Sequence, residues 1–221
     1  MQPLIPTNLL GTKTTEAAGK ENLFTLNQRL GMSFGGVIRK GYTDWFSLET
    51  GINYTNRNFE ARSASQMNGK TDSTRFGIVG YEIPVKGLVF VKLSDEIFMD
   101  VAFGLALDMF PSDVKSTGES FTFSQTSFRN SWSKNAPILP WLNTGLVANV
   151  GFEYRTDHSG YWYIGASYHR PFRPIYNTIF TVDNGVVNER TLLPLRGSYL
   201  TLDLKYFFHE EPEAREVKKT N

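Results

Sequence analysis

The stretch SYLTLDLKYFF, residues 198–208, decides the fold, because apolar and polar side chains alternate along it. From residue 200 onward, the even positions hold only apolar or aromatic residues: Leu200, Leu202, Leu204, Tyr206 and Phe208. Between them lie Thr201, Asp203 and Lys205. Successive side chains of a β-strand point to opposite faces of the sheet. The stretch therefore predicts a strand with one apolar and one polar face.

The same alternation recurs in six earlier segments, so the sequence predicts an all-β chain. These segments are residues 24–39, 45–57, 75–91, 97–109, 141–155 and 161–169. Short connections at 41–44, 94–96 and 156–160 alternate with long polar ones at about 58–73, 110–139 and 170–196. In the last of these, Asp183-Asn184-Gly185 predicts a tight hairpin turn. Tight turns at one end and long connections at the other are typical of an antiparallel up-and-down β-barrel in an outer membrane.

Alternation alone does not say which face is inside, because a soluble ligand-binding barrel alternates as well. The polar stripe favours the membrane barrel, since it combines small residues with opposite charges that suit the filled interior of a barrel of about eight strands. The sequence thus predicts a charge network in the lumen, formed by Arg29, Glu49, Glu82, Lys86, Asp100, Asp108, Glu153, Asp203 and Lys205. We expect these residues to stabilise the barrel first, and to line an ion path only as an alternative.

Composition and motifs exclude several classes of function. Lys and Arg total 23 and Asp and Glu total 22, which leaves no basic field for nucleic acid. Cysteine is absent, and no run of about 18 apolar residues predicts a transmembrane helix. His158, His169 and His209 have no metal-ligand spacing, so we expect no metal, no cofactor and no catalytic residue. A hydrolase built around His169 at the barrel rim is a minor alternative.

Two longer stretches carry a family resemblance. GMSFGGVIRKGYTDWFSLETGINY (31–54) and FGIVGYEIPVKGLVFVKLSDEIFMDVAFGLAL (76–107) resemble the strands and short turns of small OmpA-like, or PorT-like, outer-membrane barrels of Bacteroidetes-type bacteria. The final YLTLDLKYFF is similar to the C-terminal strand that the barrel-assembly machinery reads in such families. The resemblance implies that Tyr206 and Phe208 form an insertion signal. It also implies contact with outer-membrane lipid or lipopolysaccharide and a role near protein secretion.

The strand count leaves the amino-terminal part open. Seven strands are counted, whereas bacterial single-chain barrels have an even number. Residues 1–23 are therefore expected to be an irregular segment or the remnant of a first strand, with Pro3 and Pro6 unfavourable in a ladder. The odd count leaves two alternatives: an upstream strand is missing from this chain, which is the preferred expectation, or residues 2–10 form an irregular first strand. The start also lacks secretory-signal features. Residues 24–208 are expected to form the barrel, and 209–221 a polar periplasmic tail.

The long connection after residue 110 holds aromatic residues among serines and threonines. Phe121, Phe123, Phe128 and Trp132 are expected to contact a partner, because loops on a rigid scaffold commonly carry function. The sequence as a whole predicts a non-enzymatic structural or accessory subunit of an outer-membrane complex, serving secretion or nutrient uptake together with other envelope proteins. The alternatives are a narrow channel for ions or small solutes, a soluble ligand-binding barrel and a barrel-rim hydrolase.

Overall fold

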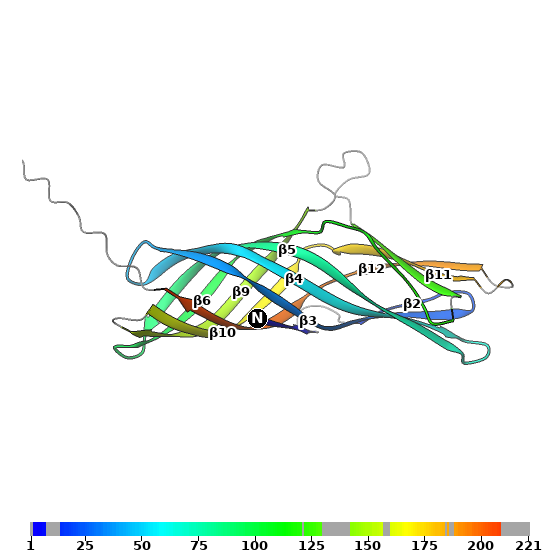
Figure 1. Ribbon diagram of the computed structural model, residues 1–221, viewed down its shortest axis with the longest axis horizontal. Coiled ribbons are helices and arrows are strands. Elements are labelled where there is room, and N and C mark those ends of the chain that lie inside the picture. Colours follow the sequence, from blue (N-terminus) through cyan, green and yellow to red (C-terminus); the bar gives the residue numbers. More distant parts are fainter. Residues whose placement is uncertain are drawn as a thin grey trace, which may run out of the picture.

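The computed structural model describes residues 2–7, 14–120, 122–129, 142–156, 160–183, 185 and 188–208. Within these ranges the regular structure consists of β-strands alone. The part of the chain so described contains no helix that is long and apolar enough to cross a membrane. The molecule is elongated, and its strands run obliquely along the long axis (Figure 1).

The larger sheet closes on itself into a ring. Its strands follow one another in the order β1, β13, β10, β9, β6, β5, β4 and β3, and β1 pairs with both β13 and β3. Their bounds are β1 (Gln2–Pro6), β3 (Asn22–Gly41), β4 (Phe46–Ser65), β5 (Thr71–Lys92), β6 (Ile97–Met109), β9 (Leu142–Thr156), β10 (Gly160–Pro171) and β13 (Tyr199–Phe207). Every neighbouring pair is antiparallel. The prediction of an all-β antiparallel fold is confirmed.

The first strand is short and closes the ring over only part of its height. Leu4 lies opposite Thr201 on one side and opposite Gly31 on the other. Both Pro3 and Pro6 fall within this strand. The less favoured sequence alternative, a first strand within residues 2–10, is the one found. The preferred expectation was a strand missing from this chain, but β1 itself occupies the place between β13 and β3. The amino-terminal segment contains another strand, β2 (Thr14–Ala18), which pairs with the beginning of β3.

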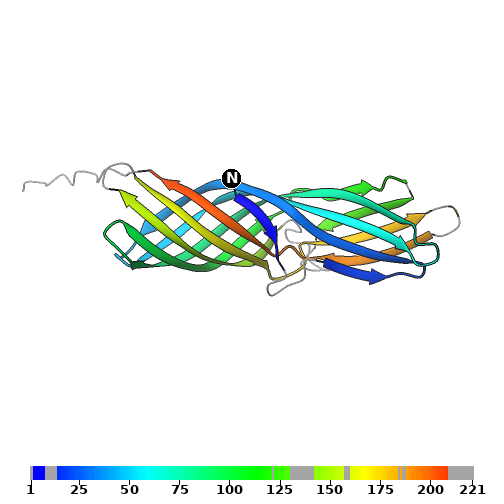
Figure 2. The same cartoon turned by 90° about the horizontal axis from the view of Figure 1, so that it is seen from below.

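Beyond the ring, the three long strands β3, β4 and β5 continue into a second layered structure, which we call the extension. Their outer parts and β2 face a smaller sheet in the order β12, β11, β8 and β7 (Figures 1 and 2). The bounds of this sheet are β7 (Val114–Thr117), β8 (Phe123–Arg129), β11 (Tyr176–Asp183) and β12 (Asn188–Leu195). The expectation of long loops at 58–73, 110–139 and 170–196 is wrong over 58–65, 71–73, 114–117, 123–129, 170–171, 176–183 and 188–195, because these residues form strands.

The hairpin predicted in the third long connection is confirmed. Strands β11 and β12 pair with Asp183 opposite Asn188. Gly185, in the turn between them, has a φ of 79°, a left-handed conformation that glycine adopts without strain. Its backbone N–H donates to the Asp183 carboxylate at 3.1 Å.

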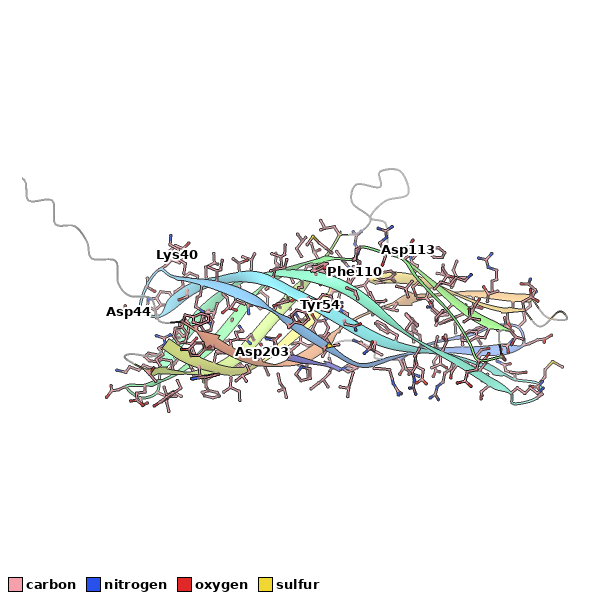
Figure 3. The ribbon with its side chains drawn as sticks, in the orientation of Figure 1. Lys40, Asp44, Tyr54, Phe110, Asp113 and Asp203 are labelled. Atoms are coloured by element: carbon pink, nitrogen blue, oxygen red, sulfur yellow. The ribbon has the colours of Figure 1, made fainter. Side chains whose placement is uncertain are left out.

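The extension encloses an apolar core. The ring of Phe24, from β3, stacks on that of Phe180, from β11, with centroids 5.5 Å apart. The rings of Phe59 and Phe76 stack with centroids 5.6 Å apart. The buried members of this core are Phe24, Leu26, Phe59, Ala61, Phe76, Ile78, Phe110, Phe123, Ile175, Tyr176, Phe180, Val182, Leu193 and Leu195. Figure 3 labels Phe110, near the middle of the molecule. The extension is therefore built like a β-sandwich, with its apolar side chains packed between the two sheets.

Two carboxylates join the two sheets of the extension along opposite sides. Glu189 of β12 accepts a hydrogen bond from the Asn22 side chain of β3 at 2.8 Å. Asp72 of β5 accepts one from the backbone N–H of Glu119 at 3.1 Å. The smaller sheet is thus fastened to the long strands by side chains as well as by its core.

The ring has the opposite arrangement of polarity. Leu202, Phe103 and Val150 are 57%, 62% and 44% exposed, whereas Asp100 and Glu153 are completely buried. The apolar side chains of the ring strands point outward and the charged side chains point inward, as the sequence predicts.

The reversal of polarity occurs within single strands. Along β4 the inward positions change from Glu49 and Arg57 in the ring to Phe59 and Ala61 in the extension. Along β3 the pairing register shifts between Arg29 and Met32. Because a one-residue shift exchanges the two faces of a strand, Phe24 lies in the core while Leu30 is exposed.

Candidate functional site

The inward side chains of the ring strands form a connected set of ion pairs and hydrogen bonds, which we call the luminal network. Eight of the nine residues predicted for it lie there: Glu49, Glu82, Lys86, Asp100, Asp108, Glu153, Asp203 and Lys205. Several of its contacts join strands that are not neighbours, which shows that these side chains point into the ring. Asp203 and Lys40, labelled in Figure 3, lie in the half of the molecule that the ring occupies.

We call the end of the ring remote from the extension its lower end, and the end next to the extension its upper end. Glu49 is the centre of the lower part of the network. Its carboxylate accepts from Lys86 Nζ at 2.8 Å, from Lys205 Nζ at 2.8 Å and from Arg39 Nη2 at 2.7 Å. Arg39 and Lys86 come from the neighbouring strands, directly opposite Glu49 in the register. Lys205 comes from β13. One fully buried carboxylate thus holds three cations, which satisfies a charge that would be costly to bury alone.

Arg39 carries the network across the ring. Its guanidinium donates to Glu153 of β9 as well as to Glu49. The guanidinium also lies over the Phe207 ring, 4.3 Å from its centroid. Glu153 in turn accepts from Arg155 Nη2 at 2.7 Å. These contacts brace the lower end of the lumen from opposite walls.

The upper part of the network lies just beneath the core of the extension. Arg57 Nη2 donates to Asp108 Oδ1 at 2.9 Å, and Arg57 is 1% exposed. Glu82 Oε2 accepts from the Tyr199 hydroxyl at 2.7 Å and lies 3.0 Å from His169 Nδ1. The Arg57 guanidinium also lies 4.8 Å from the centroid of the Tyr199 ring. This layer of charge separates the polar lumen from the apolar core above it.

Between the two parts, Asp203 and Asp100 differ in their surroundings. Asp203 accepts from Thr201 Oγ1 at 2.7 Å, from Asn149 Nδ2 at 3.1 Å and from Ser167. Both carboxylate oxygens of Asp100 are buried without a hydrogen-bond partner among the described residues. Asp100 is therefore the member of the network whose charge the described side chains compensate least.

The structure corrects the placement of one predicted member and adds others. Arg29 lies on the outer face of the extension, where its side chain is 46% exposed and pairs with Glu60 at 3.0 Å. The register shift in β3 is the reason, because it turns Arg29 away from the ring interior. Arg39 and Arg57 occupy the lumen instead. Their signal was present in the sequence, since Arg57 shares the odd-numbered face of β4 with Glu49.

A cavity of about 630 Å³ reaches the network from one side. It lies between β3 and β13, below the point where β1 begins. Its walls carry Arg39, Glu82, Lys86, His169, Asp203 and Lys205. His169 thus belongs to the buried network with Glu82. The described residues contain no group of three or more His, Cys, Asp or Glu side chains that could hold a metal ion.

The four aromatic residues predicted to contact a partner differ in their positions in the structure. Phe123 is 1% exposed and belongs to the core of the extension, so the prediction of a contact surface is wrong for this residue. The reason is that it begins strand β8, with its side chain facing the long strands. Phe128 is exposed at the other end of the same strand. Phe121 and Trp132 lie outside the described residues, as does the predicted tail at 209–221.

The predicted insertion signal lies at the end of the ring remote from the extension. Tyr206 and Phe208 are both exposed, and their rings lie edge to face with centroids 5.2 Å apart. Tyr206 also contacts Trp162 of the neighbouring strand β10 at 4.8 Å. These rings form an outward aromatic cluster. Recognition of this cluster by the barrel-assembly machinery stays a prediction.

With the fold and the network in place, the chain can be compared with known proteins. The comparisons identify no OmpA-like or PorT-like protein, so the family resemblance stays a prediction that rests on the quoted motifs. No family model, no curated protein and no solved structure matches this chain.

Proposed function

We propose that this protein is a non-enzymatic outer-membrane β-barrel that presents the extension outside the cell as a rigid platform for other envelope proteins. The observation that carries the proposal is the reversal of polarity along β3, β4 and β5. A strand that is apolar outside in one half and apolar inside in the other suits two different solvents. Lipid surrounds the ring and water surrounds the extension.

The apolar outer surface of the ring has the height of a membrane. On β5 the outward apolar side chains run from Tyr81 to Val91, which is eleven residues. About 9 to 11 residues of a tilted strand cross a bilayer. Phe34, Tyr54 and Tyr81 cluster at the upper edge of this surface, with ring centroids 4.9 and 5.9 Å apart. Such aromatic girdles mark the two interfaces of membrane barrels.

Exposed aromatic residues gather at the lower edge as well. Tyr42 and Trp45 lie in the turn between β3 and β4, and both are exposed. Trp162, Tyr206 and Phe208 form the aromatic cluster already described. Together with the upper cluster they bound a band of outward aliphatic side chains. We call this band, with its aromatic edges, the apolar belt.

The filled lumen favours a structural or accessory role over transport. Ion pairs cross the ring in its lower part, and the layer around Arg57 and the apolar core lie above them. Interiors of small barrels are commonly filled by side chains in this way. The extension, by contrast, offers partners a well-packed surface with exposed Phe128 and Leu192. A secretion or nutrient-uptake complex is the class of partner that the OmpA-like resemblance suggests.

The membrane assignment is tested by placing the two belt tryptophans in lipid. The chain with Trp132→Phe and Trp141→Phe retains Trp45 and Trp162, and is refolded into vesicles with or without brominated lipid. Brominated acyl chains are expected to quench the fluorescence of both tryptophans. A chain that folds in buffer without detergent and shows no quenching would be the soluble barrel of the sequence alternatives, and would refute the proposal.

The structural role is tested separately by conductance. The refolded protein in a planar bilayer is expected to show no steady current, because the network blocks the lumen. A steady current that changes with Glu82→Gln or Lys86→Gln would favour the narrow channel instead. Purification from native membranes in mild detergent is expected to bring envelope proteins with it, and their loss on removal of the Phe128 side chain would place the contact on the extension.

A further inference from the structure

The outer face of the extension carries an unbalanced cluster of arginines that the sequence did not predict. Arg29 of β3, Arg62 of β4 and Arg75 of β5 surround one carboxylate, that of Glu60. Their nitrogen atoms lie 3.0, 3.2 and 3.8 Å from its oxygens. We call these four residues the arginine cluster.

The cluster faces solvent and keeps a positive charge. Glu60 lies between Phe59 and Ala61, which point into the core, so its own side chain points outward. The side chains of Arg29, Arg62 and Arg75 are 46%, 55% and 73% exposed, whereas that of Glu60 is 5% exposed. One buried carboxylate neutralises one guanidinium, and two positive charges are left at the surface.

The position of the cluster relates it to the apolar belt. Arg29 is followed directly by Leu30, which is exposed on the outer surface. A groove of about 760 Å³ begins here, and its lining includes Arg29 and Arg75 together with Leu30, Asn58, Ile5 and Pro6. The Arg29 guanidinium thus lies next to the exposed Leu30 side chain, and the cluster as a whole lies on the extension side of the aromatic edge formed by Phe34, Tyr54 and Tyr81.

We propose that the arginine cluster binds the phosphate groups of an anionic lipid in the surrounding leaflet. The guanidinium fork matches phosphate oxygens with paired N–H donors, and basic side chains at a membrane surface attract anionic headgroups. The acyl chains of the same lipid would lie along Leu30 and the apolar belt below it. A membrane lipid is favoured over a soluble phosphate compound because apolar surface adjoins the arginines. The inference rests on the proposed membrane insertion.

A purely structural cluster would make the opposite prediction for Glu60. If the arginines only tie β3, β4 and β5 together through Glu60, the Glu60→Gln variant loses that tie and gains nothing. If they bind phosphate, Glu60→Gln leaves the arginines in place and removes the competing carboxylate. Glu60→Gln is therefore expected to bind the lipid at least as tightly as the wild type.

The experiment uses the full chain in nanodiscs of zwitterionic phospholipid, titrated with diphosphorylated lipid A and followed by native mass spectrometry. The double variant Arg29→Gln/Arg75→Gln is compared with Arg190→Gln, which removes an exposed arginine from β12 of the extension. A basic residue near a membrane surface contributes about 1 kcal/mol, so each removal from the cluster is expected to weaken binding about fivefold. The control variant is expected to leave the affinity unchanged.

Three results would overturn the inference. These are equal affinity of the double variant and the control, equal binding of lipid A from which both phosphates have been removed, and complete competition by millimolar inorganic phosphate. If the double variant fails to insert, weaker binding by Glu60→Gln than by the wild type overturns it too. A wild-type chain that does not enter the nanodisc refutes the proposed function and this inference with it. A chain that enters but ignores lipid A refutes this inference alone.

Discussion

The Tyr199 hydroxyl of β13 donates to the Glu82 carboxylate of β5 at 2.7 Å, which joins strands on opposite sides of the ring. Both residues are almost completely buried. A hydrogen bond to a charged group inside a protein contributes more than a neutral one. Together with the neighbouring Arg57–Asp108 ion pair, this hydrogen bond ties opposite walls of the ring together and also fills the upper part of the lumen.

Replacing Tyr199 tests this brace. Tyr199→Phe keeps the ring and removes the donor, so the free energy of unfolding is expected to fall by about 1.5 to 3 kcal/mol. Urea unfolding in detergent micelles measures the change. Tyr42→Phe serves as the control, because Tyr42 is exposed in a turn. Equal stability of the two variants would show that the hydrogen bond to Glu82 contributes nothing.

Glu49 is expected to be the most sensitive residue of the luminal network. Glu49→Gln leaves Arg39, Lys86 and Lys205 without their shared counter-charge in the lumen. Breaking a buried pair by removing one partner costs about 3 to 5 kcal/mol, and unfolding in urea should show a loss of that size. Glu16→Gln, at an exposed position of strand β2, is the matched control and should change stability little. A loss as small as that of the control would mean that water or mobile ions replace the carboxylate.

The apolar belt is tested by the same substitution at two exposed leucines. Leu202, on the ring, and Leu192, on the extension, are 57% and 59% exposed. Leu202→Lys places a charge against lipid and is expected to cost about 2 to 4 kcal/mol near the bilayer midplane. Leu192→Lys places the charge in water and is expected to cost almost nothing. Refolding yield and unfolding in lipid vesicles measure both, and equal tolerance of the two lysines would contradict a membrane around the ring.

The extension is expected to unfold separately when its core is opened. Phe180→Ala removes a ring that packs on Phe24 and Phe123, and large-to-small changes of this kind cost about 3 to 5 kcal/mol. Proteolysis of the refolded protein should then cut the extension while the ring stays protected in the membrane. Phe128→Ala, at an exposed position, is expected to remain resistant. Loss of the ring together with the extension would show that the two halves fold as one unit.

The sequence predicts the ring well because its signal is local. Asp100 and Phe103 lie on opposite faces of one strand, and the alternation between apolar and polar residues says so directly. The members of the luminal network on β4, β5, β6, β9 and β13 follow from the same rule. Their individual partners do not follow, because the choice of Arg39 and Lys205 for Glu49 depends on register and on the size of the ring.

The extension could not be predicted in the same way. In β3, Phe24 and Leu30 both occupy even positions, so no change of period announces the shift between Arg29 and Met32 that separates them. The strands β7, β8, β11 and β12 lie in segments rich in polar residues, because their outer faces meet water. Phe123 and Phe180 become recognisable as core only when the long strands opposite them are known to continue beyond the ring.

The three long strands pass from the ring into the extension without a break, and this has a mechanical consequence. A domain joined to a barrel by flexible linkers could tilt and swivel, whereas this one shares its backbone hydrogen-bond ladders with the barrel wall. If the ring lies in a bilayer as proposed, a partner bound to the extension is held at a fixed height and angle above that bilayer, and a force on the extension is transmitted directly to the ring strands.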